Sequence, residues 1–195
     1  MNRKIQIVFA DPYLGIDSFS QELKENNNSR IISLNTIIRA ELNSDSELGN
    51  LLKKQLDSGE IVSDEVIIKL LKKEINKDSL NIILQKFPRI PKHLTLIKEV
   101  LSELKIEIDN VWYLKLVNIE FALNSELSGL VIHAKKVGLT SENMLLNLTK
   151  QKDLYKNTID ILSNEFKLKT IEIDLEKHIN LSEYYKQIAT IPNNI

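Results

Sequence analysis

The chain has 195 residues, of which 43% are hydrophobic and 27% are charged, the balance of a folded globular protein rather than a disordered or fibrous one. Its 26 basic and 27 acidic residues give a net charge of -1, which argues against a broad nonspecific nucleic-acid surface. The lack of cysteine excludes disulfides and thiolate chemistry, and the histidines lack metal-ligand spacing. Because no apolar run is long enough to span a membrane, we expect one soluble cytoplasmic domain over residues 1–195.

Hydrophobic periodicity predicts strands and helices that alternate along the chain. Strands are expected at 5–10, 31–33, 80–84, 111–117 and 170–174. Helices are expected at 18–25, 34–56 (broken at 43–46), 64–75, 94–104, 121–127, 141–166 and 181–188. A capping-box spacing from Ser18 to Gln21 and a cap at Asp64 mark two helix starts. This alternation is typical of a three-layer α/β sandwich, so we predict a parallel sheet of about five strands with helices on both faces.

Three local strings are more specific than the order of the elements. They are Ile32-Ser33-Leu-Asn-Thr-Ile-Ile-Arg39-Ala-Glu41, Asp57-Ser-Gly59-Glu60-Ile-Val-Ser-Asp64-Glu65-Val66 and Phe87-Pro88-Arg89. In order and spacing they resemble three signature segments of the adenylate kinases, a family of nucleoside monophosphate kinases. The resemblance covers nearly the whole chain. It implies a P-loop kinase-like fold with a core at 1–33, 65–128 and 139–195, a monophosphate-binding helical insertion at 34–64 and a short lid at 129–138.

The stretch after the first strand departs from that family. The resemblance implies a phosphate-binding loop of the form G-x-P-G-x-G-K-G-T, in which backbone amides and a lysine hold the phosphates of ATP. Here Ile16 replaces the lysine, and Asp11 and Asp17 are expected to add negative charge where phosphate would lie. Alternatively, Asp17 or Ser18 caps the following helix. We therefore predict a degenerate phosphate loop, made of Asp11, Pro12, Gly15, Ile16, Asp17 and Ser18.

Two other parts of the kinase machinery are also altered. Gln85 stands where the resemblance implies an aspartate of the magnesium shell, so we predict no metal site. No arginine follows Arg89, so the lid cannot supply the guanidinium groups that neutralise a transferred phosphoryl group in that family. Lys135, Lys136 and Lys150 are interpreted either as substitutes for those arginines or as ordinary solvated lysines.

The residues that the resemblance assigns to the monophosphate side remain. They are Arg39 and Arg89 for the AMP phosphate, Ile38 and Val62 for the adenine wall, and Lys92 or its neighbour His93 near the base. The two arginines are read either as a retained anion site or as structural ion pairs left in the fold.

Three functional hypotheses follow. The favoured one is an adenylate kinase-related protein with little or no phosphotransfer and no assigned catalytic residue, which retains a site for AMP or phosphate. The first alternative is an active, divergent nucleoside monophosphate kinase, which would need ATP and Mg²⁺. The second alternative is a ligand-free scaffold or interaction module that uses residues 130–132 together with Trp112 and Tyr113, unless Trp112 only packs in the core. The sequence names no protein partner.

Overall fold

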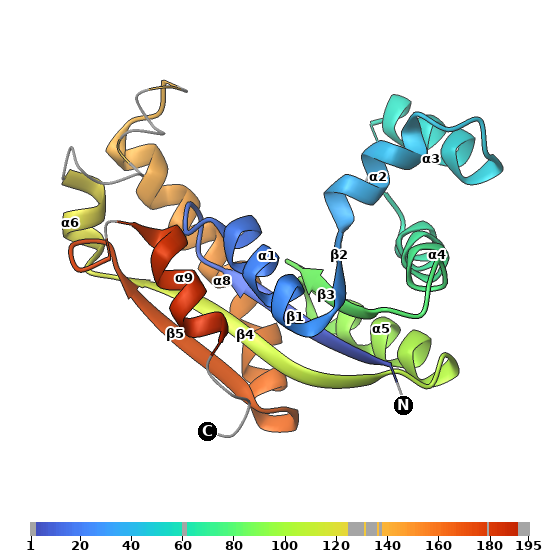
Figure 1. The fold of residues 1–195 in the computed structure, drawn as a ribbon. Helices are drawn as coiled ribbons and strands as arrows, with labels where there is room; N and C mark the ends of the chain where they lie inside the picture. Colours follow the sequence, from blue (N-terminus) through green and yellow to red (C-terminus); the bar gives the residue numbers. More distant parts are fainter. Residues whose placement is uncertain are drawn as a thin grey trace.

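The computed structural model describes residues 3–59, 62–124, 131, 136, 138–178 and 180–190. Its five strands form one parallel sheet in the order β2-β3-β1-β4-β5 (Figure 1). The strands are β1 (Lys4–Ala10), β2 (Ser29–Ser33), β3 (Asn81–Gln85), β4 (Glu107–Val117) and β5 (Leu168–Asp174). The predicted α/β class, the number of strands and their parallel direction are confirmed.

Helices cover both faces of this sheet (Figure 1). Their bounds are α1 (Ile16–Asn27), α2 (Leu34–Leu42), α3 (Glu47–Asp57), α4 (Asp64–Ile75), α5 (Pro91–Glu103), α6 (Ile119–Asn124), α8 (Ser141–Glu165) and α9 (Leu181–Ala189). Side chains of β1 alternate between two cores because successive residues of a strand point to opposite faces. Ile7 and Phe9 join the core with α4, α5 and the second half of α8, whereas Val8 joins the core with α1 and α9.

The helices α2, α3 and α4 follow one another at one side of the sheet (Figure 1). A buried carboxylate ties them together, because Glu41 at the end of α2 accepts hydrogen bonds from Lys73 of α4 at 2.7 Å and from Ser46 before α3. These contacts join the segment predicted as the monophosphate-binding insertion to α4. The bounds of that insertion and of the core remain predictions, and most of the predicted lid lies outside the described residues.

Two helices begin differently from the sequence prediction. α1 begins at Ile16, and its N-cap is Gly15, which has φ 63° and makes no side-chain capping bond. Because Gly15 turns the chain into the helix early, Asp17 and Ser18 already lie in the first turn, so the predicted caps and the capping box at Ser18 are wrong. α4 has Ser63 rather than Asp64 at its N-cap, which leaves the Asp64 carboxylate available for ion pairs.

Candidate functional site

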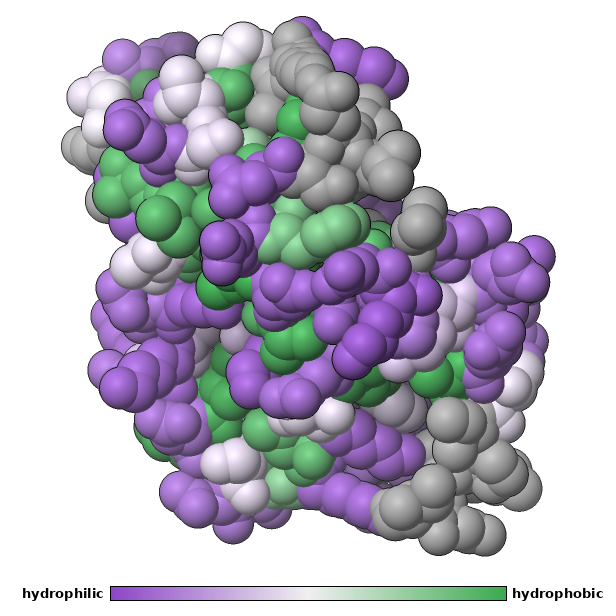
Figure 2. Space-filling view, turned by 90° about the vertical axis from the view of Figure 1, so that its left-hand side faces the viewer, coloured by the Kyte–Doolittle hydropathy of each residue, from purple (hydrophilic) through white to green (hydrophobic). Residues whose placement is uncertain are grey.

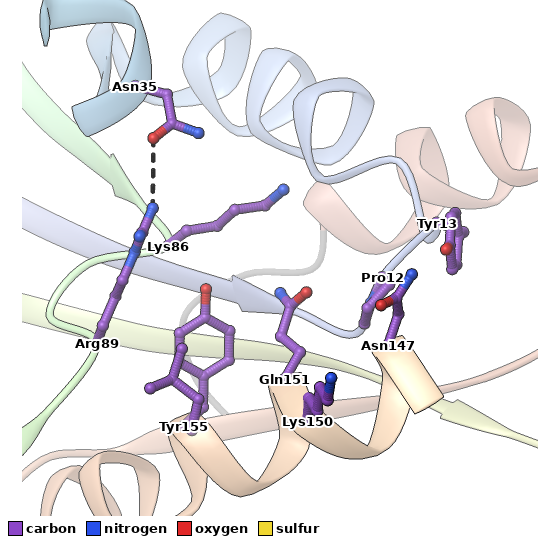
Figure 3. Close-up of a pocket in the computed structure, with 10 residues that line it drawn as sticks. Pro12, Tyr13, Asn35, Lys86, Arg89, Asn147, Lys150, Gln151 and Tyr155 are labelled. Atoms are coloured by element: carbon purple, nitrogen blue, oxygen red, sulfur yellow. Dashed lines mark hydrogen bonds between the residues drawn. The ribbon is translucent and has the colours of Figure 1, made fainter. Parts of the chain in front are cut away.

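A cavity of about 580 Å³ opens beside the carboxyl ends of β1 and β3 (Figure 3). The loops of a parallel α/β sheet gather at this edge, and ligands of such proteins bind there. The cavity is built from the loop after β1, the first turn of α2, the β3–α5 connection and one face of α8. Its lining residues are Pro12, Tyr13, Asn35, Lys86, Arg89, Asn147, Lys150, Gln151, Leu154 and Tyr155.

The charge of this lining is entirely positive. Lys86, Arg89 and Lys150 are basic, and no carboxylate is among the described residues that line the cavity. The ammonium groups of Lys86 and Lys150 make no hydrogen bond or ion pair with any described residue. Arg89 donates from Nη2 to Asn35 Oδ1 at 3.3 Å, while its buried Nε has no partner in the described part of the chain. An anion would neutralise these groups and satisfy their unused donors.

Neutral polar groups of α8 complete the same wall. Tyr155 is buried against Phe9, with ring centroids 5.3 Å apart. Burial raises the pKa of Tyr155 above its ordinary value, and the nearby charge of Arg89 opposes this rise, so the phenol keeps its proton at neutral pH. Gln151 donates to the carbonyl of Ala10 at 3.4 Å, which ties α8 to the end of β1. Figure 3 shows Gln151 and Tyr155 projecting from α8 on the side that faces Lys86 and Arg89.

The Asp11 carboxylate faces β4 rather than the cavity. It is buried, with 3% of the residue exposed, and it accepts hydrogen bonds from Tyr113 Oη and from the backbone N–H of Leu116, both at 2.8 Å. Lys152 Nζ lies 3.3 Å from it and neutralises its charge. The expectation that Asp11 adds negative charge where phosphate would lie is therefore wrong, because β4 offers donors that the sequence does not reveal.

The other residues of the predicted phosphate loop are separated. Pro12 lines the cavity, and Gly15 is the exposed N-cap of α1. Ile16, which the resemblance aligns with the lysine of that loop, is 6% exposed and packs in the core between the sheet, α1 and α9. Asp17 is exposed and lines a second cavity of about 360 Å³, between α1 and α2. Ser18 is exposed in the first turn of α1.

Of the two predicted phosphate-gripping arginines, only Arg89 lines the cavity. Arg39 is exposed in the last turn of α2 and has no hydrogen bond or ion pair with a described residue. It lies four residues after Asn35, so the two residues share one face of α2. Since Asn35 accepts from Arg89, this is the helix face that looks toward the β3–α5 connection. Neither arginine forms an ion pair with a described residue. The described contacts therefore do not support the interpretation of Arg39 and Arg89 as structural ion pairs.

The residues predicted near the base lie elsewhere. Ile38 and Val62 are partly buried and pack against the core. Lys92 forms an ion pair with Asp64, and His93 Nε2 lies 3.1 Å from the same carboxylate while its ring stacks on Phe87. The hydrogen bond from Lys92, followed by that from His93, holds the pKa of Asp64 below its ordinary value. None of these four side chains lines the cavity described above.

Several lining residues were missed from the sequence, namely Tyr13, Asn35, Lys86, Asn147, Gln151, Leu154 and Tyr155. The sequence holds a signal for Lys86 and for the polar residues of α8. Lys86 directly precedes the Phe87-Pro88-Arg89 string, and three polar residues of α8 recur at a spacing of four. Of the three lysines considered as substitutes for the lid arginines, Lys150 of α8 lines the cavity, Lys136 is exposed, and Lys135 lies outside the described residues.

Two of the residues considered for an interaction surface, Trp112 and Tyr113, are engaged inside the protein. Trp112 is 6% exposed and donates to Gln6 at 2.8 Å, and the Tyr113 hydroxyl bonds to Asp11. Of residues 130–132, only Val131 is described. On the face shown in Figure 2, the hydrophobic residues outside the grey region form separate patches between hydrophilic ones. That face therefore offers the scaffold hypothesis no continuous apolar surface in its described part.

A parallel sheet in this order, with a loop and helix after its central strand and a cation-lined cavity at its carboxyl edge, defines a P-loop kinase-like α/β protein. The family model for adenylate kinase matches residues 8–191, so the chain belongs to the adenylate kinase family. In the part of the chain that the structure describes, no helix has the length and apolar character to cross a membrane.

Relatives named adenylate kinase are distant in sequence. That of Prochlorococcus marinus (strain AS9601) is 26% identical over 188 residues, which cover 96% of each chain. That of Thermococcus onnurineus (strain NA1) is 24% identical over 206 residues, covering 95% of this chain and 92% of its own. That of Francisella philomiragia subsp. philomiragia is 37% identical over 108 residues, covering 54% of this chain and 48% of its own.

Proposed function

We propose that this member of the adenylate kinase family binds a nucleoside monophosphate such as AMP, or free phosphate, and transfers little or no phosphate. The observation that carries the proposal is the cavity at the carboxyl edge of the sheet, where Lys86, Arg89 and Lys150 stand without any described acidic residue. At about 580 Å³, its size is that of an ordinary small-ligand site.

The binding half of the proposal rests on Arg89. Its Nε is buried and has no partner among the described residues, and a phosphate oxygen would satisfy it together with the Nη groups. Arg39 lies outside the cavity but shares the helix face of Asn35, to which Arg89 already bonds, so a shared anion site requires α2 to move toward the β3–α5 connection. Ile38 and Val62 pack against the core outside this cavity, so their assignment to the base stays a prediction from the resemblance.

The proposed lack of phosphoryl transfer is supported by the residues that stand where the resemblance implies a phosphate-binding lysine and a magnesium-binding aspartate. Ile16 is packed in the core and cannot carry charge to a phosphate. Gln85 is buried, its Nε2 has no partner among the described residues, and it lines the second cavity rather than the first. With no carboxylate in the described lining of the cation cavity, the residues present do not fit a Mg²⁺ ion held by protein oxygens.

Titration calorimetry with AMP tests the binding half. We expect wild-type protein to bind AMP and Arg89→Ala to weaken binding roughly tenfold to a hundredfold, because a charge-assisted contact is lost. Arg89→Lys keeps the charge but loses the planar fork, so its affinity falls in between. Lys24→Ala, on the exposed last turn of α1, is the control and leaves the affinity unchanged. Silence of wild-type protein toward both AMP and phosphate would overturn the proposal.

A further inference from the structure

Lys86 occupies an unusual backbone position beside the loop after β1. It directly follows β3 and has φ 55°, a left-handed conformation that costs a residue with a Cβ roughly 1 kcal/mol or more. Its N–H donates to the carbonyl of Val8 at 2.9 Å, which fixes this backbone to the neighbouring strand β1. The left-handed conformation alone does not mark a site, because Lys105 has φ 53° in the turn between α5 and β4. What distinguishes Lys86 from Lys105 is that Lys86 lines the cavity.

The side chain of Lys86 extends from the end of β3 into the cavity, as Figure 3 shows. β1 and β3 are neighbouring parallel strands, with Val8 paired to Gln85, so their carboxyl ends lie side by side. The ammonium group of Lys86 therefore enters the space next to the loop that begins at Asp11. Residues 11–15 of that loop include no lysine or arginine, and Ile16, the first residue of α1, is apolar and buried.

The cavity holds more positive charge than one phosphate monoester can neutralise. A monoester carries about 1.5 to 2 negative charges at neutral pH, whereas Lys86, Arg89 and Lys150 together carry three positive charges. Arg89 lies on the α2 side, bonded to Asn35, while Lys150 projects from α8. About 1 to 1.5 positive charges are therefore left for a second anionic group after one monoester has bound. Asn147 and Gln151 of α8 add neutral donors to the same wall.

From this placement we infer that Lys86 supplies, from the end of β3, the positive charge that the loop after β1 lacks, and that with Lys150 it forms a subsite for a second phosphate. The preferred ligands of the cavity are then linked phosphates, either pyrophosphate or the diphosphate of a nucleotide. The inference deepens the proposed function and rests on it for the location of the first phosphate at Arg89. It requires no metal ion and no bond cleavage.

The left-handed backbone provides a clean variant. Glycine adopts φ 55° without strain, so Lys86→Gly removes the ammonium group while the fold is kept or stabilised. Lys105→Gly is the matched control, because Lys105 has the same backbone conformation, is exposed and does not line the cavity. Thermal unfolding of both variants verifies that each is folded before binding is compared.

Titration calorimetry with pyrophosphate, without added metal and at one fixed salt concentration, measures the subsite. We expect Lys86→Gly to weaken pyrophosphate binding roughly tenfold to a hundredfold. Lys105→Gly should stay within about twofold of wild type, since a distant exposed charge is screened. An unchanged affinity in Lys86→Gly, or no pyrophosphate binding by wild-type protein, would overturn the inference.

A parallel titration with AMP separates this inference from the proposed function. AMP binding that depends on Arg89, combined with pyrophosphate binding that ignores Lys86, refutes the subsite and leaves the proposed function standing. Pyrophosphate binding that is lost in Lys86→Gly, with no binding of AMP or free phosphate, supports the subsite and refutes the proposed function.

Discussion

Replacing Asp11 by alanine tests whether its carboxylate is structural or belongs to the phosphate site. The backbone N–H of Leu116 is buried and would lose its acceptor, at a cost of about 1–3 kcal/mol. The half-buried hydroxyl of Tyr113 would lose a further hydrogen bond of about 1 kcal/mol. Lys152 is partly exposed and can turn to solvent, so its ion pair adds little. We therefore expect Asp11→Ala to lower the free energy of unfolding by about 3 kcal/mol.

Urea denaturation of four proteins checks this value: wild type, Asp11→Ala, Tyr113→Phe and the double variant. Tyr113→Phe should cost about 1 kcal/mol in the wild-type background and close to nothing when Asp11 is already absent, because the two side chains share one hydrogen bond. The affinity for AMP should change by no more than about twofold in Asp11→Ala, since the carboxylate faces β4. A stability loss under about 1 kcal/mol together with clearly tighter AMP binding would refute this reasoning.

Three further predictions concern the loop and the helical insertion. Ile16→Lys should lower the free energy of unfolding by about 2 kcal/mol and should not produce ATP binding, because this position is in the core. Thermal unfolding measures the stability and titration calorimetry measures the binding of ATP. Gly49→Ala should lower the free energy of unfolding by at least about 1 kcal/mol in urea denaturation, because a Cβ would meet backbone oxygens at 2.5 and 2.8 Å. Gly59→Ala is the comparison: its Cβ would meet no atom within 4 Å, so it costs only the strain of its left-handed backbone. The hydrogen bond from Lys73 holds the pKa of Glu41 below its ordinary value of 4.5, so its contribution is complete above that pH and disappears as the pH falls through the folded-state pKa. In pH-dependent denaturation the stability gap between wild type and Glu41→Gln should therefore narrow in acid, and a gap that widens would contradict this sign.

The elements were predictable because their periodicity is local. Residues 5–10 are apolar except for Gln6, and they lie buried in β1. The start of α1 was not predictable in the same way. Its position depends on Gly15 adopting φ 63°, and a glycine leaves this choice to the surrounding structure.

The candidate site was only partly predictable because it is assembled from segments far apart in the sequence. Arg89 was found through the Phe87-Pro88-Arg89 string, which is itself local. Lys86, one residue before that string, was missed because its importance depends on the pairing of β3 with β1. The face of α8 that lines the cavity includes the exposed Leu154 beside the buried Tyr155, so hydrophobic periodicity alone could not identify it.

The role of Asp11 was misread for a related reason. A carboxylate next to a loop that resembles a phosphate-binding loop suggests repulsion of phosphate. The structure places the β4 donors, Tyr113 and Leu116, more than one hundred residues later in the chain within hydrogen-bond distance of it. Nothing in the local sequence indicates these partners.

Phosphorus NMR of the purified protein with AMP, ATP and Mg²⁺ tests the central claim most directly, because one sample reports both binding and transfer. The account predicts that the AMP resonance shifts or broadens on addition of protein, that Arg89→Ala strongly reduces this change at the same concentrations, and that ADP does not accumulate beyond a protein-free control. Accumulation of ADP that requires both the protein and Mg²⁺ would contradict the account and identify the chain as an active, divergent kinase.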